Sequence, residues 1–174
     1  MKKSKKITLK ALKNRVMDKL DALGDFMIDP IEDHELMAST VRKAKTFIPD
    51  VSYGKVIKVY DGDTITIATR LSGKGTIYKF SVRLLGIDTP EMKSKVPANK
   101  KVAVLAKNAL KTLIYGQVVH LKEVDYDKYG RILAEVYFEG RKLSEWMIEQ
   151  RFAVAYDGGT KSKVDWPAYY AEQQ

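Results

Sequence analysis

Four carboxylates gather in two predicted turns of a chain that is otherwise basic. Asp61 and Asp63 lie in the first turn, and Asp88 and Glu91 lie in the loop after the third predicted strand. Carboxylates held close together raise one another's pKa values, and a bound cation removes that cost. Oxygen ligands without His or Cys suit a hard ion, so Asp63 and Asp88 together predict a Ca²⁺ or Mg²⁺ site. For Asp61 alone, the favoured interpretation is a residue that only shapes its turn.

Two arginines frame these acids in the sequence. Arg83 lies on the third predicted strand, and Arg131 follows a turn and opens the fifth. The planar guanidinium group matches phosphate oxygens in a way that Lys does not. Beside a divalent cation, two such groups would stabilise the charge on a pentacoordinate phosphorus. The alternatives are a structural ion pair for Arg83 and a solvated turn residue for Arg131.

The elements that must position these residues follow from hydrophobic periodicity and turn signals. Five short strands with a helix after the third indicate an α+β fold, an OB-type five-stranded Greek-key barrel with two to three helices. The predicted strands are 53–60, 64–69, 76–85, 117–123 and 131–138, and the helices are 98–115, 142–151 and a short one capped by Asp165.

The spacing of Arg83 and Asp88 bears on whether both can line one pocket of the predicted barrel, because they are five residues apart in the sequence. A regular strand would send their side chains to opposite faces. Both reach one pocket only if the chain bends between them, and Gly86 is the permissive place for a bend.

The first 52 residues differ from the rest and form a separate helical extension, with the barrel domain over 53–174. Apolar residues recur at helical spacing from Leu9 to Met27, and a second helix is expected over 32–45. Residues 1–20 carry eight basic side chains and one acidic one. The favoured interpretation is a helix that packs on the main domain or on a partner protein. The alternative is a basic arm that binds phosphates or an anionic membrane surface.

The composition limits the classes of partner and of site that the chain can have. The chain has 174 residues, a formal net charge of +9 and no cysteine. The charge favours an anionic partner, and the missing thiols exclude disulfide frameworks, zinc ribbons and cysteine nucleophiles. No apolar run is long enough for a membrane span, and no convincing secretory signal opens the chain. We therefore expect a monomer in the cytoplasm or in another intracellular or viral setting.

Three stretches closely resemble the signature motifs of the staphylococcal nuclease (thermonuclease-like) family. They are YDGDT at 60–64, VRLLGIDTPE at 82–91 and DKYGR at 127–131. Their order and spacing agree with the family, and the resemblance covers about residues 53–160. It implies an OB-fold barrel and Ca²⁺-dependent hydrolysis of DNA and RNA that leaves 3′-phosphate ends.

The resemblance also implies a role for each matching residue. The roles are metal ligands for Asp63, Asp88 and the Thr89 carbonyl; activation of water for Glu91; phosphate binding for Arg83 and Arg131; and nucleotide contacts for Lys128, Tyr129 and Tyr156. The family's second pocket aromatic is replaced here by Gly158.

The hypothesis is a Ca²⁺-dependent nuclease of low sequence specificity acting on DNA, RNA or both. The alternative is a barrel that binds nucleic acid without catalysis. All five charged catalytic positions are present, and loss of one such group typically costs 10²–10⁴-fold in rate, which favours the enzyme.

Overall fold

The structure is a computed structural model that describes residues 8–10, 13–16, 34–71, 75–127 and 129–172. Its contacts divide the chain into two compact units, 1–45 and 46–174.

In the described part of the first unit, the structure departs from the prediction in the second helix. Residues 9–10 and 13–16 are helical as predicted, and the rest of that helix lies outside the described residues. The second predicted helix, over 32–45, is confined among the described residues to α2 (His34–Met37). The prediction is wrong after Met37. Helix α2 buries no side chain, and the Ser39 hydroxyl donates to the backbone oxygen of Glu35. Without tertiary packing so short a helix gains little stability from propagation.

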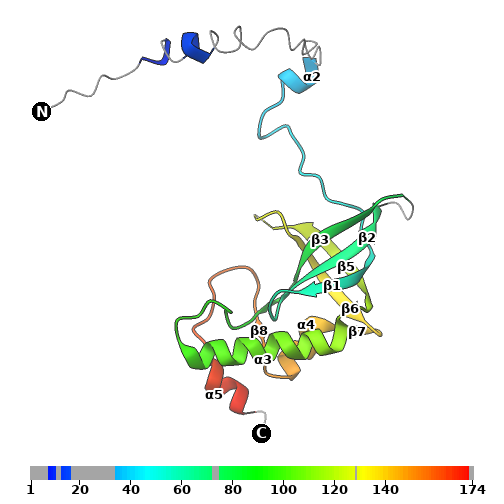
Figure 1. The fold of residues 1–174 in the computed structure, drawn as a ribbon, viewed down its shortest axis with the longest axis vertical. Helices are drawn as coiled ribbons and strands as arrows, with labels where there is room; N and C mark the ends of the chain where they lie inside the picture. Colours follow the sequence, from blue (N-terminus) through cyan, green and yellow to red (C-terminus); the bar gives the residue numbers. More distant parts are fainter. Residues whose placement is uncertain (1–7, 11–12, 17–33, 72–74, 128, 173–174) are drawn as a thin grey trace, which may run out of the picture. The chain divides into compact units, whose positions relative to one another are not determined.

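The second unit is a closed five-stranded barrel, as the sequence predicts. Its strands are β1 (Tyr53–Val59), β2 (Thr64–Arg70), β3 (Ile77–Leu84), β5 (Val118–Tyr126) and β6 (Ile132–Phe138). They are hydrogen-bonded in the order β3-β2-β1-β5-β6, and a parallel pairing of β3 with β6 closes the ring (Figure 1). The other pairings in the ring are antiparallel.

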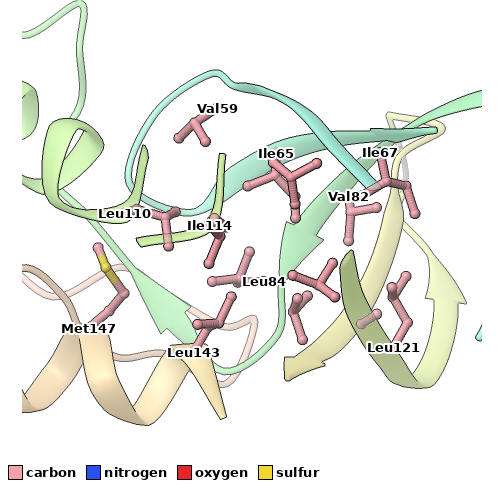
Figure 2. Close-up of a cluster of buried hydrophobic side chains, with 14 of the residues drawn as sticks. Val59, Ile65, Ile67, Val82, Leu84, Leu110, Ile114, Leu121, Leu143 and Met147 are labelled. Carbon is pink, nitrogen blue, oxygen red and sulfur yellow. The ribbon is translucent and has the colours of Figure 1, made fainter. Parts of the chain in front are cut away.

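Alternating apolar residues fill the barrel. Ile65 and Ile67 on β2 point inward and are fully buried, whereas their neighbours Thr66 and Ala68 are partly exposed. Figure 2 shows how such side chains from the strands meet Leu110 and Ile114 of a helix at the same core. Each aliphatic side chain of this size contributes about 1.5–3 kcal/mol when fully buried.

Three helices accompany the barrel: α3 (Pro97–Ile114), α4 (Leu143–Glu149) and α5 (Trp166–Ala171). Helix α3 lies across one end of the barrel, with α5 against it (Figure 1). The N-terminal cap of α5 is the predicted one, since the Asp165 carboxylate accepts a hydrogen bond from the Ala168 amide at 3.2 Å. In the described part of the chain, no helix combines the length and apolar character needed to cross a bilayer.

One pairing that matters for the site was not predicted. β4 (Ile87–Asp88) pairs with β8 (Val154–Ala155) as a small second sheet. A third short strand, β7 (Arg141–Lys142), extends the barrel sheet beside β6. Strands of two residues leave no periodic signal in the sequence.

Candidate active site

One pocket collects most of the residues that the sequence singles out. It has a volume of about 460 Å³ and is polar. Its lining residues are Asp61, Asp63, Arg83, Thr89, Pro90, Glu91, Tyr129, Arg131, Tyr156 and Lys161. Asp88 contacts two of these side chains, Arg83 and Lys161. Lys128 lies outside the described residues, so eight of the nine predicted site residues are brought to one place.

The turn between β1 and β2 holds the first two acids. The Asp61 carboxylate accepts a hydrogen bond from the Asp63 amide at 3.2 Å. Burial, together with the negative charge of Asp63, raises the pKa of Asp61 to about 6. Asp63 itself is buried and accepts a hydrogen bond from the Thr64 hydroxyl at 2.8 Å. Both carboxylates are thus crowded and poorly solvated, which is where a cation is stabilising.

Gly62 makes this turn possible. A Cβ at this position would lie 3.2 Å from the side chains of Ala106 and Thr89. The turn therefore packs directly against α3 and against the loop that carries Thr89, which brings the two acidic segments together.

Arg83 bridges the two acidic segments. Its guanidinium group pairs with the Asp63 carboxylate, donates to the Ile87 backbone oxygen at 3.0 Å, and lies 3.8 Å from Asp88 Oδ1. The predicted bend is confirmed, because Gly86 has a φ of +86° and lets the chain turn back after β3. The pairing of β4 with β8 then orients Asp88 toward Arg83.

Asp88 is, with Asp63, one of the two buried carboxylates of the candidate cation site. The residue is 7% exposed, and its buried Oδ1 accepts no hydrogen bond. Lys161 Nζ lies 2.8 Å from that oxygen as an ion pair, but its geometry is not that of a hydrogen bond. A buried carboxylate is costly without a compensating positive charge, which the Lys161 ammonium supplies here and a metal ion would also supply.

The donor set fits a hard cation held only partly by protein. Across the described residues, no three His, Asp or Glu side chains converge on one point. Asp63, Asp88 and the backbone carbonyl of Thr89 would supply three oxygens. Ca²⁺ takes six to eight oxygen ligands and accepts water and phosphate oxygens among them, so the remaining positions would be open to water and substrate.

Arg131 is held by a residue that the sequence analysis did not single out. Its Nε donates to Asp127 Oδ2 at 2.7 Å, while the amides of Tyr129 and Arg131 donate to Asp127 Oδ1 at 2.8 and 3.0 Å. Burial raises the pKa of Asp127, but the hydrogen bonds from Arg131 and Tyr129 outweigh it, so the pKa is lowered. Asp127 opens the DKYGR stretch, and Asp at the start of a turn is the signal that would have identified it.

Glu91 lies at the pocket rim with Lys161, the second residue that the sequence analysis missed. The Glu91 side chain is 69% exposed, and its Oε1 accepts a hydrogen bond from Lys161 Nζ at 2.8 Å. Burial by itself lowers the pKa of Lys161. The interactions with the Asp88 and Glu91 carboxylates raise this pKa by more than burial lowers it, so the net shift is upward. No local sequence signal relates Lys161 to acids some 70 residues away.

Two tyrosines form the aromatic part of the pocket. Tyr129 is 73% exposed, and the Arg131 guanidinium lies 5.5 Å from its ring centroid. The Tyr156 hydroxyl donates to the Gly159 backbone oxygen at 2.8 Å, and its amide donates to Gly86. Gly158 has a φ of +95°, a conformation that an aromatic residue rarely adopts, so the family's second aromatic would be strained in this loop.

Comparison with known proteins gives an independent result. The family model described as "Staphylococcal nuclease homologue" matches residues 81–174, more than half of the chain. A Haemophilus influenzae protein named "Uncharacterized endonuclease" is 37% identical over 102 residues, which cover 59% of this chain and 51% of the relative. "Endonuclease YncB" of Bacillus subtilis is 34% identical over 110 residues, 60% of this chain and 49% of the relative.

A plant relative matches a smaller part of this chain. "Staphylococcal-like nuclease CAN1" of Arabidopsis thaliana is 35% identical over 82 residues, 45% of this chain and 24% of the relative. The chain spans about half the length of the two bacterial relatives. With the barrel, the acidic pocket and the family match in agreement, the chain belongs to the staphylococcal nuclease homologue family.

Proposed function

We propose that this chain is a Ca²⁺-dependent nuclease that hydrolyses phosphodiester bonds of DNA, RNA or both and leaves 3′-phosphate ends. The observation that carries the proposal is the convergence of Arg83 and Arg131 with the acids of two separate loops on one polar pocket. Relatives named as endonucleases and nucleases support the same reaction class.

The two arginines bind the scissile phosphate. Arg83 approaches from β3 and Arg131 from the start of β6, so the phosphate would lie between two guanidinium groups. Asp127 uses only the Nε of Arg131, and one terminal nitrogen makes a long hydrogen bond of 3.5 Å to the Thr64 hydroxyl, so the terminal nitrogens are the groups that would turn to the substrate. Charge-assisted hydrogen bonds of this kind strengthen as negative charge builds on the equatorial oxygens in the transition state.

Asp63 and Asp88 would hold the Ca²⁺, with the Thr89 carbonyl. When bound, the ion supplies Lewis-acid stabilisation of the phosphate charge and helps orient the attacking water. Asp63 keeps its place through Thr64 and Arg83, so the ligand is fixed before the metal arrives.

Glu91 is the candidate general base. Its exposed carboxylate at the rim accepts a proton from a water that attacks phosphorus, as the bond from phosphorus to the 5′ oxygen breaks. The departing 5′ oxygen takes a proton from solvent, and the products are a 3′ phosphate and a 5′ hydroxyl. Tyr129, Tyr156 and Lys128 would contact the bound nucleotide.

The test is cleavage of end-labelled single-stranded DNA and RNA with Ca²⁺, Mg²⁺ or chelator, followed by end-group analysis. Activity with Ca²⁺ and 3′-phosphate products is expected, and Glu91→Gln and Arg131→Ala should each lower kcat/KM by about 10²–10³-fold. Cleavage that persists in chelator would refute the metal role. Binding without cleavage under every condition would instead support a non-catalytic nucleic-acid-binding barrel.

A further inference from the structure

Lys161 connects one loop to two acids of the pocket. Its Nζ lies 2.8 Å from Asp88 Oδ1 and 2.8 Å from Glu91 Oε1. Under the proposed function, Asp88 is a metal ligand and Glu91 is the general base. A positive charge of the protein itself therefore lies between the proposed ligand and the proposed base.

Lys161 is the least constrained cation of the pocket. The Arg83 side chain is 15% exposed and pairs with the Asp63 carboxylate, and the Arg131 side chain is 29% exposed with its Nε held by Asp127. The Lys161 side chain is 46% exposed. An ammonium group on a flexible four-carbon stem is a point charge that is not bound to one geometry, unlike the planar guanidinium fork. Of the three cations, Lys161 is therefore the one that can leave its partners most easily.

The loop that carries Lys161 is anchored at its two ends. At its start, β8 pairs with β4, and at its end Asp165 caps α5, whose Trp166 is buried. Between these anchors, residues 157–163 are exposed and lie outside any helix or strand, in the segment that leads to α5 in Figure 1. We call residues 157–163 the Lys161 loop.

The middle of the Lys161 loop depends on Lys161 itself. Within the part of the chain that the structure describes, the contacts of Lys161 with Asp88 and Glu91 are the only hydrogen bonds or ion pairs that join residues 160–163 to the rest of the protein. The other hydrogen bonds of this loop are local, from Tyr156 to Gly159 and from Gly159 to Asp157. Loss of the Lys161 contacts would therefore release the middle of the loop and leave both anchors in place.

A bound cation and Lys161 would compete for the same oxygen. Asp88 Oδ1 is buried, and Lys161 Nζ is 2.8 Å from it. A divalent ion coordinated by Asp88 would lie close to this ammonium group, and like charges repel strongly at such a separation. Salt screens buried and partly buried charges much less than exposed ones, so the repulsion persists in solution. Metal binding should therefore favour a Lys161 that has moved away from Asp88.

We propose that Lys161 is an internal cation that neutralises Asp88 and Glu91 until Ca²⁺ binds, and that it is displaced on binding, which frees the Lys161 loop from the pocket rim. The inference rests on the proposed Ca²⁺ site and adds a coupling between that site and a loop. The coupling is reciprocal, so the Lys161 contacts lower Ca²⁺ affinity by the same factor by which Ca²⁺ weakens these contacts. Displacement also leaves the Glu91 carboxylate free to accept a proton.

The experiment follows the metal and the loop separately in the full chain. Lys161→Met is matched with Lys163→Met, which removes the same charge from an exposed position two residues further along the loop. Ca²⁺ binding is measured by calorimetry at about 0.15 M salt, where exposed charges more than about 8 Å apart are largely screened. Circular dichroism checks that the variants are folded.

The motion of the loop is measured by electron paramagnetic resonance of a nitroxide spin label. The chain has no cysteine, so Thr160→Cys places a single label on the Lys161 loop. Thr112→Cys places the control label on an exposed position of α3. Spectra are recorded with chelator and with saturating Ca²⁺, in the parent and in the Lys161→Met background.

Lys161→Met should bind Ca²⁺ about fivefold more tightly than the parent, at the lower end of typical coupling factors, and Lys163→Met should stay within about twofold of the parent. The loop label should move slowly in chelator and faster with Ca²⁺ in the parent. In the Lys161→Met background it should move fast under both conditions. The α3 label should not respond to Ca²⁺.

Three results would overturn the inference: a Ca²⁺ affinity of Lys161→Met no higher than that of Lys163→Met, a loop label in the parent that Ca²⁺ does not mobilise, or a loop label that is as slow in Lys161→Met as in the parent. Failure of the parent and both variants to bind Ca²⁺ would refute the proposed metal site and the inference with it. Ca²⁺-dependent cleavage with an unresponsive loop would refute the inference alone.

Discussion

The hydrogen bond between Asp127 and Arg131 gives a direct test of how the pocket orients its arginine. Asp127→Asn keeps an oxygen for the two backbone amides of the turn but replaces the carboxylate that faces Arg131 Nε at 2.7 Å. Hydrogen bonds to charged groups contribute about 1.5–3 kcal/mol. Because the Arg131 side chain is 29% exposed, we take the lower end of that range. About 1.5 kcal/mol corresponds to about a tenfold fall in kcat/KM.

The assay is Ca²⁺-dependent cleavage of labelled single-stranded DNA by the two single variants, Asp127→Asn and Arg131→Ala, and by the double variant. If Asp127 acts by positioning Arg131, its substitution should change kcat/KM by less than about threefold once Arg131 is gone. The matched control is Asp125→Asn, which alters an exposed carboxylate on β5, two residues before Asp127, that accepts a hydrogen bond from the Tyr126 amide. Equal tenfold losses in both backgrounds would refute positioning and indicate a general effect on the fold.

Three further outcomes are expected. Gly62→Ala should destabilise the protein by about 1–3 kcal/mol in urea unfolding, because the new methyl would lie 3.2 Å from two packed side chains; an unchanged midpoint would contradict that packing. Lys161→Met should raise Ca²⁺ affinity about fivefold by calorimetry, since a positive charge near Asp88 costs a cation about 1 kcal/mol even at the dielectric constant of water; equal or weaker binding would count against Asp88 as a ligand. The hydrogen bond from Lys142 lowers the pKa of Glu135 below 4.5, so its stabilisation is present above that pH and is lost as the pH falls through the lowered value. Glu135→Gln should therefore be less stable than the parent at pH 7, and thermal melts of the two should converge toward pH 3; a constant difference would refute the linkage.

Most of the barrel follows from local sequence. Alternating residues predict β1, β2 and β6 to within one residue of their observed ends, because half-buried strands carry a period of two. Turn chemistry places the acids of the first hairpin and the bend at Gly86, whose positive φ is the conformation that glycine favours. The helix predicted over 32–45 is observed only as α2, which buries no side chain. Local helical propensity without a buried face does not sustain a helix beyond one turn.

By itself, the sequence determined which chemical groups are present, where the strands and turns lie, and that Asp63, Arg83, Asp88, Glu91 and Arg131 form a set. Only the tertiary structure decided their partners. Lys161 approaches Asp88, Asp127 holds Arg131, and β8 orients β4, and two of these contacts join segments more than 60 residues apart. Burial, and with it the unsatisfied oxygen of Asp88 and the raised pKa of Asp61, depends on those long-range contacts. Local patterns cannot specify it, because the low dielectric around a carboxylate is created by residues that are its neighbours only in the folded chain.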